Sequence, residues 1–124
     1  MFVFVDAPYS TVLLQVVLDI VSHSTCNTQW HGLLTSNMLC AGSVGGKGSC
    51  LGDSGGPLVC KQGDKWFQYG VVSFGHRSGC ALPDYPSVFA DVVNLLPWIQ
   101  QQTGSQYLQC TYSLHVITMH LQYM

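Results

Sequence analysis

The chain has 124 residues, a length that suits one small domain with a modest hydrophobic core. Only 8% of its residues are charged, against about 25% in ordinary soluble domains, and the formal net charge is -2. This balance excludes a basic surface for nucleic acid or anionic lipid, so we expect neither nucleic acid nor a membrane as a partner.

The cysteines point to an oxidising compartment. Six cysteines in a chain of this length are unusual in the cytosol, where thiols stay reduced. The sequence has no Cys-x-x-Cys pair and no His-x-x-x-His pair to bind zinc, so we expect no metal and no cofactor. The amino-terminal run does not resemble a secretory signal peptide, because it has no Lys or Arg and is interrupted by Asp6 and Pro8. We therefore expect the natural chain to begin farther upstream.

The first half of the chain predicts a strand, a short helix and loops. Residues 11–20 are rich in aliphatic and β-branched side chains, which is typical of a strand. Ser24 suits the N-cap of a short helical turn that runs to Trp30. Residues 42–56 are dense in glycine, which indicates loops that need positive φ or a close approach of the backbone to a ligand.

The second half begins with strands. Residues 57–61 and 66–74 have strand character and are joined by the turn 62–65, so they predict a hairpin. A loop with two prolines follows at 78–86, and residues 87–91 predict another short strand.

A helix and a tail complete the chain. Asp91 or the residues just after it begin a helix over about 92–102, which carries an apolar stripe and stops at Gly104. The last residues contain no Lys, Arg, Asp or Glu and show no clear helical or strand period. We treat residues 104–124 as an appended tail of unknown structure.

The motif CLGDSGGPLVC at residues 50–60 is the sharpest signal in the chain. Ser54 stands in a turn walled by glycines, so its hydroxyl can approach a carbonyl group without steric crowding. The backbone N–H groups of Gly52 and Ser54 can converge on one oxygen and stabilise its developing negative charge. The motif therefore predicts a nucleophilic serine with an oxyanion hole. The alternative is a glycine-rich turn with an incidental serine.

Gly-Asp-Ser-Gly-Gly-Pro resembles the segment around the nucleophilic serine of chymotrypsin-like (trypsin-like, S1) serine proteases. The likeness covers about residues 10–103, because NMLCAG at 37–42, VVSFG at 71–75 and PSVFADV at 86–92 resemble successive strands of that family. The resemblance implies an all-β fold: the later part of the second antiparallel Greek-key barrel, with a C-terminal helix. Residues 1–103 would be the C-terminal portion of a protease domain, and the N-terminal barrel would be a missing partner.

The resemblance also implies roles for single residues. Ser54 would be the nucleophile, Gly52 would help to bind the oxyanion, and Asp53 would shape the site by pairing with the amino terminus that zymogen cleavage releases. The substrate pocket would be formed by Gly48, Ser49, Ser73, Phe74, Gly75 and Ser87.

Four of the six cysteines have a family counterpart that pairs within this chain. The resemblance implies the disulfides Cys26–Cys40 and Cys50–Cys80. In the family, Cys60 bonds a cysteine upstream of anything in this chain, and Cys110 has no counterpart.

The pocket residues imply an uncharged P1 side chain of small to medium size. Gly48 stands where trypsin-like members carry an aspartate, and without that carboxylate nothing offsets the desolvation of a substrate Arg or Lys. Ser87 occupies a wall position where glycine is usual, which narrows the pocket. His76 and Arg77 at the pocket rim are interpreted as solvated loop residues.

The partners that a catalytic serine requires are missing from the motif's surroundings. A serine is a weak nucleophile until a histidine takes its proton and a carboxylate orients that histidine. The family order is His, Asp, Ser, and neither expected context precedes Ser54; Asp19, His23 and His31 fall in other segments.

We therefore expect a serine endopeptidase by family, acting on a protein or peptide substrate and secreted in its full-length form. As this fragment alone it should be inactive, with unpaired strand edges. The alternative is a non-catalytic product: a truncated protease-like binding module.

Overall fold

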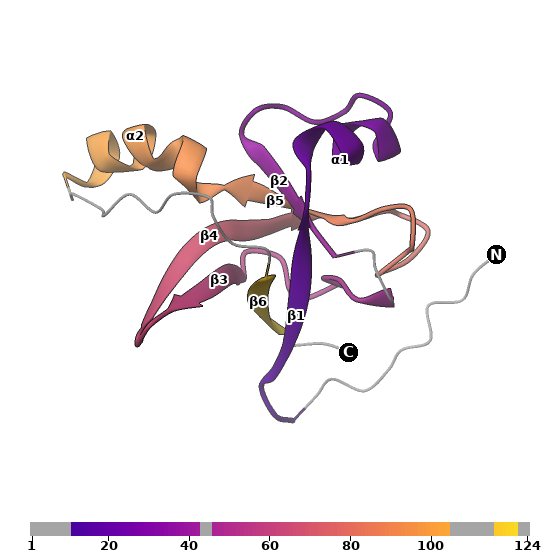
Figure 1. Cartoon of the computed structure of the whole chain (residues 1–124), viewed down its shortest axis with the longest axis horizontal. Coiled ribbons are helices and arrows are strands. Elements are labelled where there is room, and N and C mark those ends of the chain that lie inside the picture. Colours follow the sequence, from indigo (N-terminus) through magenta and orange to yellow (C-terminus); the bar gives the residue numbers. More distant parts are fainter. Residues whose placement is uncertain (1–10, 43–45, 105–115, 122–124) are drawn as a thin grey trace.

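The computed structural model describes residues 11–42, 46–104 and 116–121. These residues form six strands and two helices (Figure 1). In chain order the elements are β1 Leu14–Val21, α1 His23–Gln29, β2 Met38–Ala41, β3 Pro57–Gln62, β4 Lys65–Phe74, β5 Ser87–Asp91, α2 Val92–Thr103 and β6 Val116–Leu121.

The strands form one closed antiparallel barrel in the order β1-β2-β5-β4-β3-β6. Every pairing between neighbouring strands is antiparallel. Figure 1 shows α2 following β5 at one side of the barrel, and α1 at the end of β1. The expected all-β architecture, with part of a chymotrypsin-like barrel and a C-terminal helix, is confirmed.

The predicted hairpin of β3 and β4 is present. Each strand extends one residue farther toward the turn than predicted. Gln62 and Lys65 are register partners, so only two residues make the turn. Gly63 has a φ of 59°, a conformation that most residues avoid and that two-residue hairpin turns require. The sequence Gln62–Lys65 therefore folds back as a tight turn because it contains this glycine.

Helix α1 is capped by Ser22, so the prediction of Ser24 as the N-cap is wrong. The Ser22 Oγ accepts a hydrogen bond from the Thr25 N–H at 3.2 Å. A capping residue must have an extended backbone, and Ser22 has a ψ of 144°. Ser24 lies inside the first helical turn instead.

Helix α2 has the expected ends. The Asp91 carboxylate accepts hydrogen bonds from the N–H groups of Val93 and Asn94, at 3.0 and 3.2 Å. Gly104 ends the helix with a φ of 67°, and its N–H donates to the Gln100 carbonyl. This left-handed C-cap is the conformation in which glycine is favoured.

The tail contributes strand β6, which the sequence pattern did not predict. β6 pairs with β1 from Leu14↔Leu121 to Asp19↔Val116, and with β3 at Leu58↔Met119 and Val59↔Thr118. The expectation of unpaired strand edges is therefore wrong, because β6 joins the two strands that would otherwise be edges. Figure 1 shows β6 beside β1.

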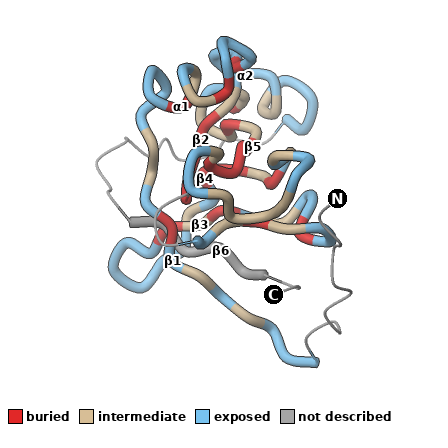
Figure 2. The backbone as a smooth tube through the Cα atoms, turned by 90° about the vertical axis from the view of Figure 1, so that its right-hand side faces the viewer, coloured by how far each residue is buried: buried red, intermediate tan, exposed pale blue. Residues whose placement is uncertain are grey.

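Figure 2 shows where the buried residues fall along the backbone. Their side chains form two clusters. The first, called the barrel core, consists of Leu18, Leu39, Ala41, Leu58, Cys60, Tyr69, Val72 and Phe89. The second, called the helix α1 cluster, consists of Cys26, Trp30, Leu34, Cys40 and Val88.

The barrel core is packed closely. A methyl group added to Gly70 would lie 3.0 Å from the Phe89 Cβ and 3.3 Å from the Leu58 Cβ. A side chain at this position would make contacts tighter than most in proteins, so Phe89 or Leu58 would have to shift slightly to admit it.

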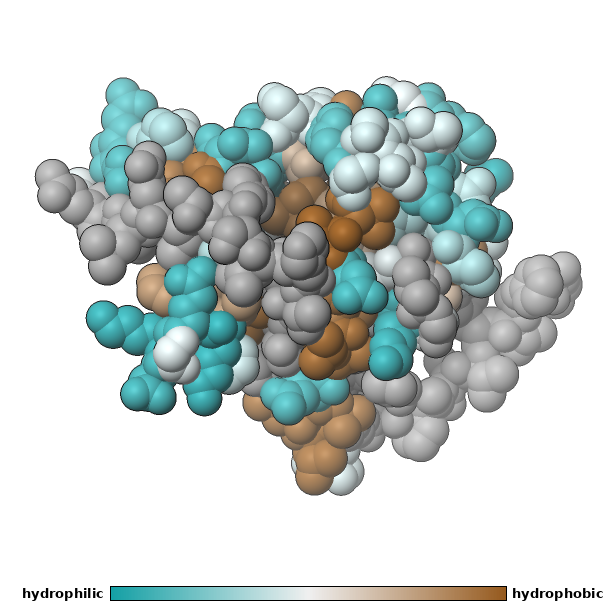
Figure 3. All heavy atoms as spheres, viewed as in Figure 1, coloured by the Kyte–Doolittle hydropathy of each residue, from teal (hydrophilic) through white to brown (hydrophobic). Residues whose placement is uncertain are grey.

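Apolar side chains also reach the surface near the start of β1, at the lower edge of the view in Figure 3. Val12 and Leu13 are exposed there, immediately before the strand begins. Single exposed apolar residues are common on protein surfaces and indicate no interface by themselves.

Candidate active site

A glycine-flanked turn presents Ser54 at the surface. Gly52 and Gly55 have φ values of 96° and 81°, which side-chain-bearing residues rarely adopt. Ser54 between them is exposed, whereas Asp53 is buried with 4% of its surface accessible. The sequence Gly-Asp-Ser-Gly thus turns one side chain outward and its neighbour inward.

Hydrogen bonds between residues of the turn stabilise its conformation. The Asp53 N–H donates to the Cys50 carbonyl at 3.1 Å, and the Cys50 N–H donates to the Asp53 carboxylate at 2.9 Å. The Gly56 N–H donates to the Asp53 carbonyl at 2.9 Å. Asp53 therefore organises the turn through its backbone and its side chain together.

Two further hydrogen bonds join the turn to β4. The Gly55 N–H donates to the Val72 carbonyl, and the Val72 N–H donates to the Gly56 carbonyl, both at 2.9 Å. Because Val72 lies in β4, which pairs with β3 and β5, the position of the Ser54 turn depends on the barrel sheet.

A cavity of about 290 Å³ opens beside Ser54. Its walls come from the Ser54 turn, from the end of β4 and the loop after it, and from the start of β5. Six of the nine predicted catalytic and pocket residues line it: Ser49, Ser54, Ser73, Phe74, Gly75 and Ser87. Gly48, Gly52 and Asp53 lie beside the cavity and do not line it.

Gly48 and Ser49 pack against Ser87 at one wall. The Ser49 N–H donates to the Ser87 Oγ at 2.8 Å, and both serines are buried. A Cβ at Gly48 would lie 2.9 Å from the same Oγ, which is closer than real Cβ contacts. None of the described residues lining the cavity is acidic, and Arg77 at the rim is a cation.

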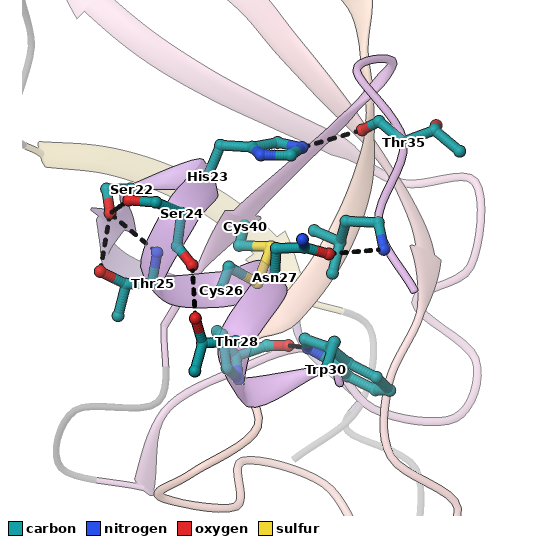
Figure 4. The surroundings of a disulfide bond; sticks show 12 residues. Ser22, His23, Ser24, Thr25, Cys26, Asn27, Thr28, Trp30, Thr35 and Cys40 are labelled. Atoms are coloured by element: carbon teal, nitrogen blue, oxygen red, sulfur yellow. Dashed lines mark hydrogen bonds between the residues drawn. A yellow bond between two sulfur atoms is a disulfide. The ribbon is translucent and has the colours of Figure 1, made fainter. Parts of the chain in front are cut away.

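Both expected disulfides are present. Cys50 and Cys80 are bonded with a Cα separation of 5.1 Å, and they link two segments of the cavity wall. Cys26 and Cys40 are bonded with a Cα separation of 6.4 Å and join α1 to β2 (Figure 4). Cys60 is buried in the barrel core, and Cys110 lies outside the described residues.

An aromatic cluster supports the cavity from behind. The Trp30 ring meets Phe74 and Tyr85 edge-on, with centroid distances of 5.2 and 5.4 Å. His76 stacks on Tyr85 at 4.0 Å. His76 is a partly buried loop residue whose ring also packs on Tyr85, and Arg77 is exposed as expected.

Sequence reasoning missed Tyr85 as a wall residue. Its only signal was its place beside Pro86, two residues before the predicted pocket residue Ser87. The Trp30 indole N–H donates to the Pro86 carbonyl at 3.1 Å, which holds this segment against α1.

The acidic and histidine residues upstream of Ser54 are placed elsewhere. Asp19, His23 and His31 do not line the cavity. The His23 Nε2 lies 3.1 Å from the Thr35 carbonyl oxygen, at the opposite end of α1 from Trp30 (Figure 4). Within the described ranges, no three His, Cys, Asp or Glu side chains are grouped closely enough to hold a metal ion.

Comparison with known families decides the relationship. Residues 4–99 match the family described as Trypsin, which is more than half of the chain. The chain belongs to the trypsin family. The resemblance noted from the Gly-Asp-Ser-Gly-Gly-Pro motif is confirmed.

Individual trypsin-family relatives are similar over most of this chain. Transmembrane protease serine 5 of Homo sapiens is 48% identical over 95 residues, which are 73% of this chain and 20% of that protein. Transmembrane protease serine 7 is 42% identical in Mus musculus and 43% in Homo sapiens, in each case over 103 residues, 81% of this chain and 12% of that protein. The trypsin-family chain described here thus spans a fifth or less of these relatives' length.

These relatives overturn the predicted location. They are named as transmembrane proteases, so the expectation of a secreted trypsin-family protein is wrong. The expectation of no membrane partner has no support from these relatives. None of the helices in the described part of the chain is long and apolar enough to cross a membrane.

Proposed function

We propose that the Ser54 turn and its cavity form the nucleophile-bearing half of a serine endopeptidase site, within a protease-like portion at residues 1–103. The observation that carries this proposal is the exposed Ser54 at the mouth of a cavity, in a turn that the barrel holds in place. The reaction is hydrolysis of a peptide bond in a protein or peptide substrate. A general base takes the Ser54 hydroxyl proton as Oγ attacks the carbonyl carbon. The peptide C–N bond then breaks, and the amine leaves with that proton. Water hydrolyses the resulting acyl-serine ester, which releases the acid and restores the hydroxyl.

The amides of Gly52 and Ser54 are proposed to bind the oxyanion. The other N–H groups of the turn are used internally: those of Asp53 and Gly56 bond within it, and that of Gly55 bonds Val72. In a serine protease of unrelated fold, removing one side-chain donor from the oxyanion hole lowers kcat by about 10²–10³. Asp53 acts as a positioning residue, because its carboxylate holds the Cys50 N–H.

The cavity is proposed to take an uncharged P1 side chain of small to medium size. Support comes from Gly48, which carries no carboxylate, and from the wall that Ser49 and Ser87 form by their hydrogen bond. Burying a substrate cation there would leave its charge uncompensated, which is costly in a desolvated site.

The general base is proposed to come from the N-terminal barrel of the whole protein. Asp19, His23 and His31 lie away from the cavity, and His76 is engaged by Tyr85 and by the Ser78 N–H, which donates to its Nδ1 at 3.2 Å. The 124-residue chain expressed alone should therefore neither react with a fluorophosphonate at Ser54 nor cleave chromogenic peptides.

A graft tests the proposal directly. Residues 11–104 should replace the aligned segment of human transmembrane protease serine 5, with Ser54→Ala as the matched control. We expect peptide hydrolysis and fluorophosphonate labelling by the graft and neither by the control. A folded graft that binds substrate peptides without hydrolysing them, while its parent is active, would contradict the proposal.

The same graft tests the P1 preference. Gly48→Asp with Ser87→Gly restores a carboxylate and removes the Oγ that a Cβ at residue 48 would strike at 2.9 Å. We expect kcat/KM for Arg and Lys substrates to rise relative to Ala and Val substrates, and Gly48→Ala with Ser87→Gly to show no such rise. A dominant Arg or Lys preference in the unmodified graft would refute the uncharged-P1 assignment.

The second candidate function is a non-catalytic binding module. The observation that favours it is the engagement of His76, the histidine that lines the Ser54 cavity. Peptide binding by the isolated chain, measured by calorimetry and lost when Ser87→Trp fills the cavity, would support this candidate if the graft proved inactive.

A further inference from the structure

Strand β6 lies beyond the trypsin-family match, which ends at residue 99. It is nevertheless the element that closes the barrel. Without β6 the sheet order would be β1-β2-β5-β4-β3, with β1 and β3 as open edges. Each edge would present a row of unpaired N–H and C=O groups, which attract any available strand.

The space between β1 and β3 is one strand wide. β6 runs antiparallel to both, so β1 and β3 run parallel to each other. Neighbouring strands lie about 4.8 Å apart, which places β1 and β3 about 9.6 Å apart across β6. Direct pairing of β1 with β3 would require a five-strand barrel with a different tilt and stagger.

The register of β6 suits this space. In β1, partly or fully buried residues alternate with exposed ones, beginning with Leu14 buried in part. The positions opposite Leu14, Val16 and Leu18 are held by Leu121, Met119 and Ile117. The exposed positions Gln15, Val17 and Asp19 face His120, Thr118 and Val116. A slip by one residue would place His120 and Thr118 opposite the buried positions, so the pattern specifies the register.

β6 also helps to bury residues of the barrel core. Leu18 in β1 and Leu58 and Cys60 in β3 are 1%, 0% and 4% exposed. All three belong to the two strands that β6 joins, so their burial depends on closure of the barrel there. β3 begins at Pro57, three residues after Ser54, and the closing strand therefore also steadies the base of the Ser54 turn.

The segment between α2 and β6 is long enough to bring β6 to the space between β1 and β3. Eleven residues, 105–115, separate the end of α2 at Gly104 from β6. An extended chain of that length spans at most about 36–40 Å, roughly twice the ~18 Å length of a helix such as α2. Residues 105–124 carry no Lys, Arg, Asp or Glu, so no charge opposes insertion of the tail between two strands.

We propose that the groove between β1 and β3 is an acceptor site for an extended apolar strand, and that residues 116–121 of the same chain are its tethered occupant. The groove binds a strand through two ladders of backbone hydrogen bonds. Specificity comes from apolar residues at every second position. This is strand addition used within one molecule.

A proline variant of the full chain tests the proposal. Thr118 has register partners on both sides, Val17 in β1 and Val59 in β3, and proline at this position removes its N–H donor. In Thr118→Pro we expect amide exchange of residues 14–18 and 58–59 to accelerate at least tenfold. The matched control Thr111→Pro, outside β6, should leave these rates unchanged. Unchanged rates in Thr118→Pro, or equal acceleration in both variants, would overturn the proposal.

A peptide supplies the second test. A synthetic peptide of residues 113–124 added to Thr118→Pro should restore the slow exchange of residues 14–18 and 58–59. The same peptide with the Thr118→Pro change should restore nothing. Failure of the unmodified peptide to bind at millimolar concentration would overturn the acceptor assignment.

If Thr118→Pro does not fold, the proposal can be tested on the unmodified chain. Nuclear Overhauser contacts between backbone protons of Thr118 and those of both Val17 and Val59 are expected. Absence of either set would overturn the proposal. Contacts that appear between differently labelled copies in a mixed sample would instead assign the occupant to a second copy and overturn the tether.

Discussion

The barrel core and the helix α1 cluster lie on opposite faces of the same two strands. On β2, Leu39 and Ala41 belong to the barrel core, while Cys40 between them belongs to the helix α1 cluster. On β5, Phe89 and Val88 divide in the same way. Successive residues of a strand point to opposite faces, so one pair of strands serves two interiors.

The two interiors are held by different means. The barrel core consists mainly of aliphatic and aromatic side chains from strands β1 to β5, and it depends on closure of the whole sheet. The helix α1 cluster is fixed by a few directed links, the Cys26–Cys40 disulfide and the hydrogen bond from Trp30 to Pro86 (Figure 4). The barrel core should therefore be destabilised by substitutions that leave a cavity, and the helix α1 cluster by substitutions that remove its disulfide or its hydrogen bond.

The largest effect is expected in the barrel core. Phe89 is fully buried, and Phe89→Ala removes its ring from the barrel core. The free energy of unfolding should fall by about 3–5 kcal/mol, measured by urea denaturation. Leu33→Ala, at an exposed position, should change it by no more than about 0.5 kcal/mol. A loss below 1 kcal/mol for Phe89→Ala would mean that the barrel core is not closed.

The second-largest effect is expected when the disulfide of the helix α1 cluster is removed. Replacing both Cys26 and Cys40 by alanine opens a loop with a sequence separation of 14 residues. In the chain-entropy account this costs about 3 kcal/mol, which calorimetry should record as a lower Tm. Near-ultraviolet circular dichroism of Trp30 should change as well. An unchanged Tm would show that the cluster is held by packing alone.

A smaller effect is expected from the polar link of the same cluster. Trp30→Phe removes the indole N–H that donates to the Pro86 carbonyl, and a buried acceptor left without a donor costs about 1–3 kcal/mol. The exposed Trp98 provides the control, since Trp98→Phe should leave the free energy of unfolding almost unchanged. Equal losses in both variants would contradict a role for this hydrogen bond.

The smallest effect concerns the cap of α1. Ser22→Ala removes the Oγ that accepts from the Thr25 N–H and should cost about 1 kcal/mol. Ser24→Ala is the matched control, because Ser24 lies within the helix, and it should cost less than half as much. The reverse order would restore Ser24 as the cap.

The hairpin, the ends of α2 and both disulfides could be predicted because their signals are local or belong to a recognised motif. Gly63 is favoured in the turn, Asp91 and Gly104 in the caps, and none of these depends on distant residues. The six residues gathered around the Ser54 cavity followed from the motif and its resemblance. Their chemical roles stay predictions.

The missed features depend on contacts between distant parts of the chain. Ser22 and Ser24 have the same side chain, and the backbone bend after β1 decides between them. Tyr85 became a wall residue through its stack on His76 and its contact with Trp30. β6 has a weak strand pattern of its own. It is defined by pairing with β1, about a hundred residues earlier in the chain.

The pairing of β1 with β6 makes the barrel circular in sequence as well as in space. The first and last described strands are neighbours, with Leu14 opposite Leu121, so a short linker could join them. New ends could then be opened at the Gly63–Asp64 turn, a tight loop on which no barrel-core residue lies. Chains permuted in this way are tolerated where the original ends lie close together and the new ends fall in a loop. In the permuted chain, β4 would come first and the Ser54 turn would stand near the carboxyl terminus.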